Sequence, residues 1–407
     1  MMRKLAGLFL VGTLVFTVSA FAQDFSPITN ILGAGVVTNQ VLRLEFPRND
    51  LSVQVEGTQL DPNVGVETEL SFQQVTSQMI QAAQTGATAA ATGNTATTQT
   101  VTSTGFAGRT TAMGTTGATG FAGRTTAMGT TAVTTTTGTT GTAGTMATGT
   151  VRNFATLQPG QVIVTGEICV TDTEEPKVID QLQRDGLAIT AVHAHFINAS
   201  QDIRFIHVEG AGDGATLAQK LQNSLNIIGT PSATVNTGST TGAQFADIMN
   251  ALGVTGAKIE GNVIKFSPAL LSSFKLGGVQ LNSGMGSESE INFQVASASS
   301  AIVNAEIVVE ASGADPVIQS LRSSGFSVAG LHNNTLDETP RLFYVHAFGS
   351  GSQTSLAQAI SQALDADKGN LGARPDMGIA STGGTANSSM AATGTATRSR
   401  VTSTASR

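Results

Sequence analysis

The sequence predicts an α+β fold of two homologous units, each a mostly antiparallel sheet with helices packed on one face. Three observations predict it. Two blocks of sequence recur in the same order, strand-like and helix-like segments alternate within a copy, and low-complexity tracts separate the parts that can fold. The 407 residues are enough for two ordinary domains.

The recurring blocks define the two units. The first block reads GTQLDPNVGVETELSF at residues 57–72 and GVQLNSGMGSESEINF at residues 278–293. The second reads PKVIDQLQRDG from residue 176 and PVIQSLRSSG from residue 316. A shared ancestor explains these matches because order and spacing are nearly kept. We therefore expect a first unit at 23–225, a linker at 226–247 and a second unit at 248–365.

The elements of a unit follow from local pattern. Residues 161–171 are rich in β-branched residues and predict a strand. Pro176 at a first helical turn and Gly186 as a stop signal then bound a helix. The remaining predictions are strands at 188–197 and 203–209, a helix at 217–225, and earlier strands near 51–55 and 69–75. The order from residue 161 is β-α-β-β-α.

The N-terminus has the three parts of a secretory signal. Arg3 and Lys4 precede an apolar run, and an Ala-Phe-Ala cleavage site ends at Ala22. We expect residues 1–22 to be removed and the chain to be exported, either periplasmic or extracellular. After removal, no segment is long and apolar enough to span a membrane.

Two tracts have the composition of disordered chain. Residues 83–150 are almost entirely Thr, Gly, Ala and Ser, and TGFAGRTTAMGTT occurs there twice. The tail at 366–407 has similar composition. Neither can bury enough apolar surface to offset the cost of ordering its backbone. Both are predicted to lie outside the folded units.

Charge and composition exclude some partners. The formal net charge is −7, and there are no basic clusters, which argues against nucleic acid and anionic membrane surfaces. Cys169 is the only cysteine, so there is no internal disulfide framework. The remaining partner classes are a small ligand or a component of the cell envelope.

All five histidines fall in equivalent hairpins of the two units. His193 and His195 are two apart on a predicted strand and therefore share a face, and a hairpin folded about Ser200 places His207 opposite His193. Three imidazoles with an open fourth position are typical of zinc sites, and imidazole also binds copper, nickel and iron. The alternative is that these histidines are half-buried strand residues with ordinary hydrogen bonds.

The second unit departs from this pattern. His332 and His346 keep the fourteen-residue spacing of His193 and His207, but Asn334 stands where the first unit has His195. Two imidazoles and one amide are a poor site for a transition metal. We therefore expect a degenerate copy that serves packing or ligand contacts.

Other candidates have weaker signals. Glu167 and Glu306 occupy equivalent strand positions, and Glu167 is a candidate ligand or general base. Arg204 and Arg341 are candidates for contact with a carboxylate or phosphate. A second pair of carboxylates recurs in each unit, at Glu67 and Glu69 and at Glu288 and Glu290, and would mark either function or a charged edge strand.

These residues resemble a known family. The sequences AVHAH and IRFIH in the first unit, and GLHNN and PRLFYVH in the second, are similar to the LppY/LpqO family of exported bacterial proteins, a tandem domain of unknown function. The resemblance implies that the family's three histidines fall on His193, His195 and His207, and on His332, Asn334 and His346. It supports the architecture and export, and it carries no activity.

Three functions fit the sequence. The first is a binding module for a metal or small ligand, with zinc or another transition metal on His193, His195 and His207. The second is a metal-assisted hydrolase or lyase in which Glu167 acts as base. The third is an envelope structural or interaction protein that binds no metal.

Overall fold

The computed structural model describes residues 23–83, 154–229, 233, 242–254, 257–297 and 299–367. The predicted signal peptide, nearly all of the predicted insertion at 83–150 and nearly all of the predicted tail at 366–407 lie outside the described residues. None of the described helices is both long and apolar enough to cross a bilayer.

The first six-stranded sheet has the order β1-β2-β5-β6-β8-β7, with all neighbours antiparallel. Its strands are β1 (Val36–Thr38), β2 (Val41–Pro47), β5 (Glu67–Gln74), β6 (Val162–Thr171), β7 (Ala188–His193) and β8 (Ile203–Gly212). Its helices are α1 (Ser26–Leu32), α3 (Glu175–Asp185) and α4 (Gly214–Ile227). A two-stranded ribbon of β3 (Gln54–Val55) and β4 (Thr58–Gln59) lies beside it.

The second sheet repeats this order as β9-β10-β13-β14-β17-β15. Its strands are β9 (Lys258–Glu260), β10 (Val263–Phe266), β13 (Glu290–Ser297), β14 (Ser300–Glu310), β15 (Ser327–His332) and β17 (Leu342–Gly351). Its helices are α5 (Ala246–Leu252), α6 (Ala314–Ser323) and α7 (Gln353–Ala366). A small sheet joins β11 (Ser273–Leu276), β12 (Val279–Asn282) and β16 (Glu338–Thr339), and short 3-10 turns lie at Phe154–Thr156, Ala243–Phe245 and Ser283–Met285. The predicted α+β class and duplication are confirmed.

Local sequence explains the helix ends. Helix α3 has Pro176 in its first turn and ends at Gly186 in the left-handed conformation, as predicted. Asp213 caps α4, since its Oδ1 accepts the Thr216 amide at 2.8 Å. Ser352 caps the equivalent α7 by accepting the Ser355 amide. Each cap satisfies an amide that has no partner within its helix.

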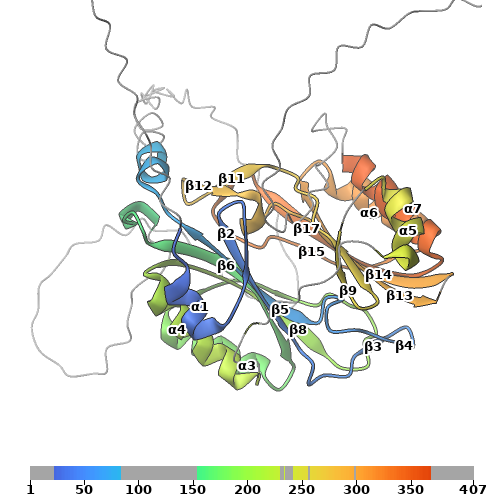
Figure 1. The fold of residues 1–407 in the computed structure, drawn as a ribbon, viewed down its shortest axis with the longest axis horizontal. Coiled ribbons are helices and arrows are strands. Elements are labelled where there is room, and N and C mark those ends of the chain that lie inside the picture. Colours follow the sequence, from blue (N-terminus) through green and yellow to red (C-terminus); the bar gives the residue numbers. More distant parts are fainter. Residues whose placement is uncertain are drawn as a thin grey trace, which may run out of the picture.

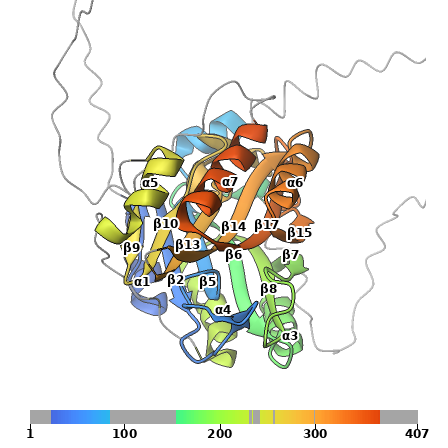
Figure 2. The same cartoon turned by 90° about the vertical axis from the view of Figure 1, so that its right-hand side faces the viewer.

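The two sheets pack face to face, so the molecule has four layers, helices–sheet–sheet–helices (Figures 1 and 2). One apolar core lies between the first sheet and its helices, and another lies between the second sheet and its helices. Two further apolar clusters combine residues of both units, for example Ile163 with Val308, and Phe205 with Phe348. The inner faces of both sheets are therefore buried against each other.

A polar layer separates these two inter-sheet clusters. Inward-facing residues along β6 run from Ile163 through Thr165 and Glu167 to Cys169, from one apolar cluster to the other. On β14 the equivalent row runs from Ile302 to Val308 through Asn304 and Glu306. Carboxylates and histidines therefore lie midway between the sheets.

Three predictions about strands were wrong. The strand predicted at 188–197 ends at His193, and the one near 51–55 is only the two-residue β3. The register pairs His193 with Phe205 and Ala191 with His207, so His193 is not directly opposite His207. The connection is held by the β3–β4 ribbon, since the Ser200 amide donates to the Gln54 carbonyl at 2.8 Å. The turn lies one residue earlier in the chain than predicted. The register therefore changes by two residues, which leaves His193 and His207 on the same face.

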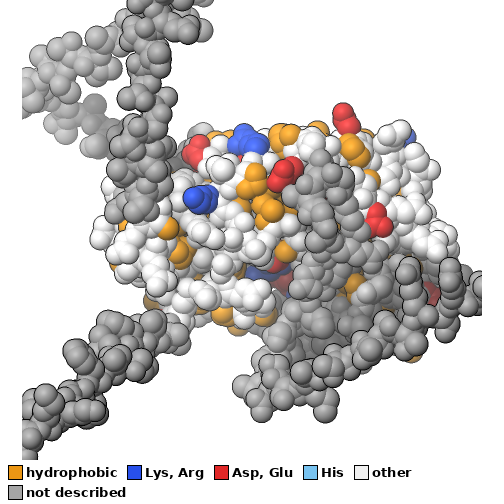
Figure 3. Space-filling view, turned by 90° about the horizontal axis from the view of Figure 1, so that it is seen from above, with side chains coloured by type: hydrophobic (Ala, Val, Ile, Leu, Met, Phe, Trp, Pro, Cys, Tyr) orange, Lys and Arg blue, Asp and Glu red, His pale blue; other side chains and the backbone are white. Residues whose placement is uncertain are grey.

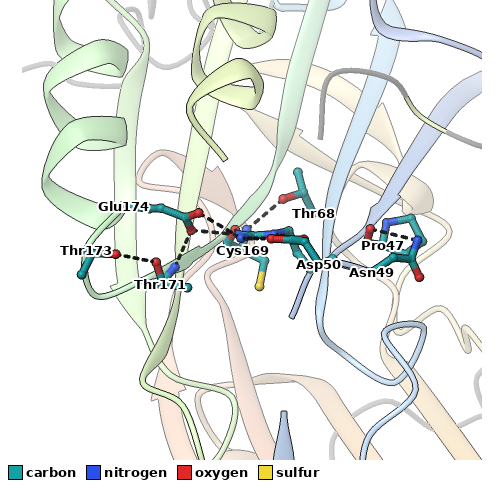
Figure 4. A network of polar contacts seen from close by, with 9 residues as sticks. Pro47, Asn49, Asp50, Thr68, Cys169, Thr171, Thr173 and Glu174 are labelled. Atoms are coloured by element: carbon teal, nitrogen blue, oxygen red, sulfur yellow. Dashed lines mark hydrogen bonds and ion pairs between the residues drawn. The ribbon is translucent and has the colours of Figure 1, made fainter. Parts of the chain in front are cut away.

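Arg48 ties the end of β2 to the start of α3 through its contact with Glu174. Figure 4 shows its partners Asp50, Cys169 and Glu174. Its side chain is fully buried and forms two hydrogen bonds each with Asp50 (both 2.9 Å) and Glu174 (both 3.0 Å). Its Nη1 also donates to the Cys169 carbonyl at 2.7 Å. A buried guanidinium needs such partners because an unpaired buried charge is strongly destabilising.

We predict that Arg48→Met lowers the free energy of unfolding by about 3 kcal/mol, because Glu174 and the Cys169 carbonyl lose their donor. Arg204→Met is the matched control. The Arg204 side chain is 41% exposed, and its ion pair with Glu175 is long at 3.9 Å, so this substitution should cost less than about 1 kcal/mol. Urea unfolding followed by circular dichroism measures both. Equal effects of the two substitutions would contradict a structural role for the Arg48 network.

Candidate metal centre between the two sheets

The centre begins with one carboxylate and one histidine on neighbouring strands of each sheet. Glu167 on β6 pairs in register with His207 on β8, and Glu306 on β14 pairs with His346 on β17. Because directly paired residues project from the same face, each carboxylate lies beside an imidazole. The His207 Nε2 to Glu167 Oε2 distance is 3.2 Å, and the His346 Nε2 to Glu306 Oε2 distance is 3.4 Å.

The other histidines come from the ends of β7 and β15. His193 and His332 are the last residues of these strands, and each follows a bulge that shifts its register. His195 lies beyond β7 in the connection to β8, where its ring stacks on Phe205. Its Nε2 is 3.3 Å from Glu167 Oε2. Asn334 takes the equivalent place in the second unit and donates to Glu306 Oε1 at 3.1 Å.

His193 lies at the middle of the imidazoles. Its ring centroid is 3.7 Å from that of His332 and 4.8 Å from those of His207 and His346. Its Nε2 is 2.7 Å from His207 Nε2. All five histidines therefore form one cluster, and both units contribute to it.

Among the residues that the structure describes, three groups each have ligand atoms that lie within 4.8 Å of one another. They are His193 with His207 and His332, His193 with His195 and His346, and Glu167 with His195 and Glu306. Every group takes two residues from the first unit and one from the second. The predicted triple of His193, His195 and His207 thus contributes to all three groups, and the second unit completes each of them.

Several ligand atoms in the cluster lack hydrogen bonds. His195 and His346 are 3% and 0% exposed, and within the described part of the chain neither nitrogen of either ring has a hydrogen-bond partner. Glu167 Oε2 and Asn334 Oδ1 also have no hydrogen-bond partner in that part of the chain. The Nε2 atoms of His195 and His207 lie 3.3 Å and 3.2 Å from Glu167 Oε2, but they are not aligned for a hydrogen bond. Unsatisfied buried polar atoms cost about 1–3 kcal/mol each, so an arrangement like this one requires another partner.

The protonation states of the histidines and of Glu167 suit cation binding. Burial and the neighbouring imidazoles hold the pKa values of His193, His332 and His346 below the ordinary histidine value, which keeps these rings neutral. Burial opposes ionisation of Glu167, but His195 and His207 hold its pKa well below the usual range. Burial and the nearby Glu167 raise the pKa of Glu306 well above it. Neutral imidazoles and an ionised carboxylate are the forms that bind metal ions.

A cavity of about 70 Å³ adjoins the cluster. Glu167, His207, Glu306 and Asn334 are among the residues that line it, together with Arg43 and the carboxylates of Glu69, Glu288 and Glu290. Arg43 Nη2 is 3.1 Å from Glu288 Oε2, and its Nη1 is 3.8 Å from Glu290 Oε1. The Tyr344 hydroxyl, which also lines the cavity, donates to the Gly286 carbonyl. The cavity has room for a few water molecules or a very small ligand.

The surface differs from this interior. On the face shown in Figure 3, charged side chains stand mostly one by one, and acidic and basic groups are also visible in a hollow near its centre. Arg204 and Arg341 belong to the surface, with 41% and 45% of their side chains exposed. Arg341 contacts Glu338 and the Leu336 carbonyl. The structure therefore does not bring the two predicted ligand-contact arginines to the cluster.

Arg43 was not predicted from the sequence, and the edge-strand explanation of the paired carboxylates was wrong. Arg43 and Glu45 alternate with Leu42, Leu44 and Phe46 along β2, and that two-residue period was the signal for a strand with a polar inner face. The paired carboxylates at 67–69 and 288–290 do not mark edge strands, because β5 and β13 are interior strands. Glu67 instead binds Lys265 at 2.6 Å between the sheets.

Comparison with known proteins identifies the family. A model of a family described as Domain of Unknown Function (DUF1259) matches residues 26–100, 108–227 and 246–366, most of the chain. The chain belongs to the DUF1259 family. The first two matched segments supply the six strands of the first sheet, and the third supplies the six strands of the second. No curated protein and no solved structure gives a significant match.

We predict that the metal-free protein loses stability as pH falls below about 6.5, in part through His332. Burial lowers the pKa of His332 to about 3. Above the ordinary value of 6.5 neither state binds the proton, whereas between about 6.5 and 3 only the unfolded state does. Each pH unit in that window then lowers the free energy of unfolding by about 1.4 kcal/mol per such group.

Urea unfolding of chelator-treated protein near pH 7.5 and near pH 5 tests this against His332→Asn. Wild type should lose about 2 kcal/mol more than the variant across that interval. The same loss in both proteins would show that His332 remains titratable in the folded state.

Proposed function

We propose that this chain is an exported metal-binding module whose transition-metal centre lies between the two sheets. One observation carries the proposal. The five imidazoles of both units converge with Glu167 and Glu306 in the interior, and the nitrogens of His195 and His346 have no hydrogen-bond partner among the described residues. A transition-metal ion is the ligand that satisfies several neutral imidazoles at once.

The geometry favours metal binding over the interpretation that these histidines are ordinary packed residues. A packed histidine normally donates one ring N–H and accepts at the other nitrogen. His346 is fully buried with both nitrogens unpaired in the described structure, and its nearest carboxylate, Glu306, is 3.4 Å away. A solely structural role would leave that desolvation cost without compensation.

Export is part of the proposal and rests on the N-terminal sequence. The basic start, apolar run and Ala-Phe-Ala site of residues 1–22 support it, as does the resemblance to the LppY/LpqO family. The acidic charge and single buried cysteine are compatible with a periplasmic or extracellular protein that needs no disulfide.

We predict that the protein purified after metal-replete expression contains a stoichiometric transition metal. The double variant His193→Ala/His195→Ala removes a ligand from all three groups, so its metal content should fall at least about tenfold. Arg204→Ala/Arg341→Ala is the matched control and should keep the wild-type content, because both side chains lie outside the cluster. Elemental analysis measures all three proteins. Absence of bound metal from the wild type would overturn the proposal.

The cavity favours a second candidate, a metal-assisted hydrolase or lyase. It places Glu306, whose pKa is raised by burial and by the nearby Glu167, next to the cluster and beside space for a small substrate, the position that a general acid needs. Glu167, the base expected from the sequence, lies against His195 and His207, where a ligand role suits it better. If the candidate is correct, metal-loaded protein should hydrolyse a chromogenic ester or phosphate, and Glu306→Gln should reduce kcat/KM at least about tenfold. No turnover by fully loaded protein would eliminate it.

A further inference from the structure

The cluster offers more ligands than one ion can use. It contains five imidazoles, two carboxylates and the carboxamide of Asn334. A zinc-like ion usually takes about four ligands. A single ion would therefore leave several buried imidazoles without a partner, at about 1–3 kcal/mol for each unsatisfied atom. The excess of ligands indicates more than one ion, whereas the function proposed above requires only one.

Two of the three ligand groups share no residue, and the third, His193 with His195 and His346, overlaps both of them. One is the nitrogen group of His193, His207 and His332, and the other is the carboxylate group of Glu167, His195 and Glu306. His346 adds to the second, because its Nε2 is 3.4 Å from Glu306 Oε2. Each group draws on both sheets. Each therefore has enough ligands to hold an ion without taking any from the other.

Glu167 lies where the two groups meet. Its Oε2 is 3.2 Å from Nε2 of His207, a member of the nitrogen group, and 3.3 Å from Nε2 of His195, a member of its own group. A carboxylate can bind two ions at once because its two oxygens offer several lone pairs. In known two-metal sites the ions are about 3.5–4 Å apart, within the span of one carboxylate.

We propose that the centre is dinuclear: one ion on His193, His207 and His332, a second on His195, Glu306 and His346, and Glu167 as a bridge between them. The inference rests on the metal-binding function proposed above and adds the number of ions and the assignment of their ligands.

The two ions differ in their surroundings. The first has only imidazole ligands besides the bridge, which favours zinc, copper or nickel, and the second has oxygen ligands that also suit manganese or iron. The cavity is lined by Glu306 and Asn334 as well as Glu167 and His207. Residues assigned to both ions therefore line the cavity, and a water molecule or a small oxygen-donor ligand in it would lie beside the centre.

Metal stoichiometry of the full chain is the first test. Chelator-treated protein is titrated with Cu²⁺, and bound copper is measured after removal of free metal. Wild type should bind two ions per chain. His332→Ala and Glu306→Gln should each bind one, since each removes a ligand from one group only. Glu175→Gln, a carboxylate substitution on the surface helix α3, is the matched control for Glu306→Gln and should bind two.

Electron paramagnetic resonance gives a readout that altered folding alone would not produce. Two Cu²⁺ ions held a few ångströms apart give the half-field signal of a spin pair. Wild type and Glu175→Gln should show this signal, and the two single-site variants should show only isolated Cu²⁺. Glu167→Gln should weaken binding of both ions, because it removes the shared ligand. Circular dichroism confirms that each variant is folded.

The outcomes separate the two proposals. One ion per wild-type chain, lost completely in both His332→Ala and Glu306→Gln, would overturn the dinuclear assignment and leave the metal-binding function intact. Two bound ions that both give the full signal of isolated Cu²⁺ would overturn the shared bridge. No bound copper, together with no metal after expression, would overturn both proposals. Two ions retained in Glu306→Gln would contradict the assignment of the carboxylate group.

Discussion

The burial of a polar layer between two apolar clusters is the constraint on which the structure depends. Each sheet has a helix-covered face that is almost entirely apolar and an inner face where Glu167 or Glu306 lies in mid-strand. The two inter-sheet clusters hold the faces together on either side of the layer between them. In such surroundings a charged or polar group without a partner is costly, and a paired one is held in a fixed position.

Duplication explains how this layer arises. Each unit presents the same row of a carboxylate beside a histidine, and packing the two copies face to face brings equivalent rows together. His193 and His332 consequently meet at a ring separation of 3.7 Å, although 139 positions separate them in sequence. The substitution of Asn334 for a histidine makes the two halves unequal, and its amide group binds Glu306 instead. The second unit, which lacks a third histidine of its own, therefore contributes one residue to each ligand group of the cluster.

The sequence predicted what is local and missed what depends on packing between units. Pro176 and Gly186 bounded α3 correctly because caps act within one turn, and the spacing of His193 and His207 survived a shifted turn because the parity of the strand was unchanged. The face-to-face packing was not predicted, since strands buried on both sides lack clear alternation: β6 reads VIVTGEICVT. Ligand groups that join residues of both units could not be derived without that packing.

The proposed metal binding would therefore be linked to the docking of the two units. Every candidate ligand group draws on both sheets, so an ion bound there joins them directly, and the free energy of binding also stabilises the docked arrangement. Without an ion, the unsatisfied nitrogens of His195 and His346 oppose docking, while the apolar clusters and ion pairs such as Lys265 with Glu67 favour it. The sequence keeps the apolar clusters on both sides of the histidines, which allows the sheets to be positioned before an ion arrives and confines the ion's contribution to the middle of the interface.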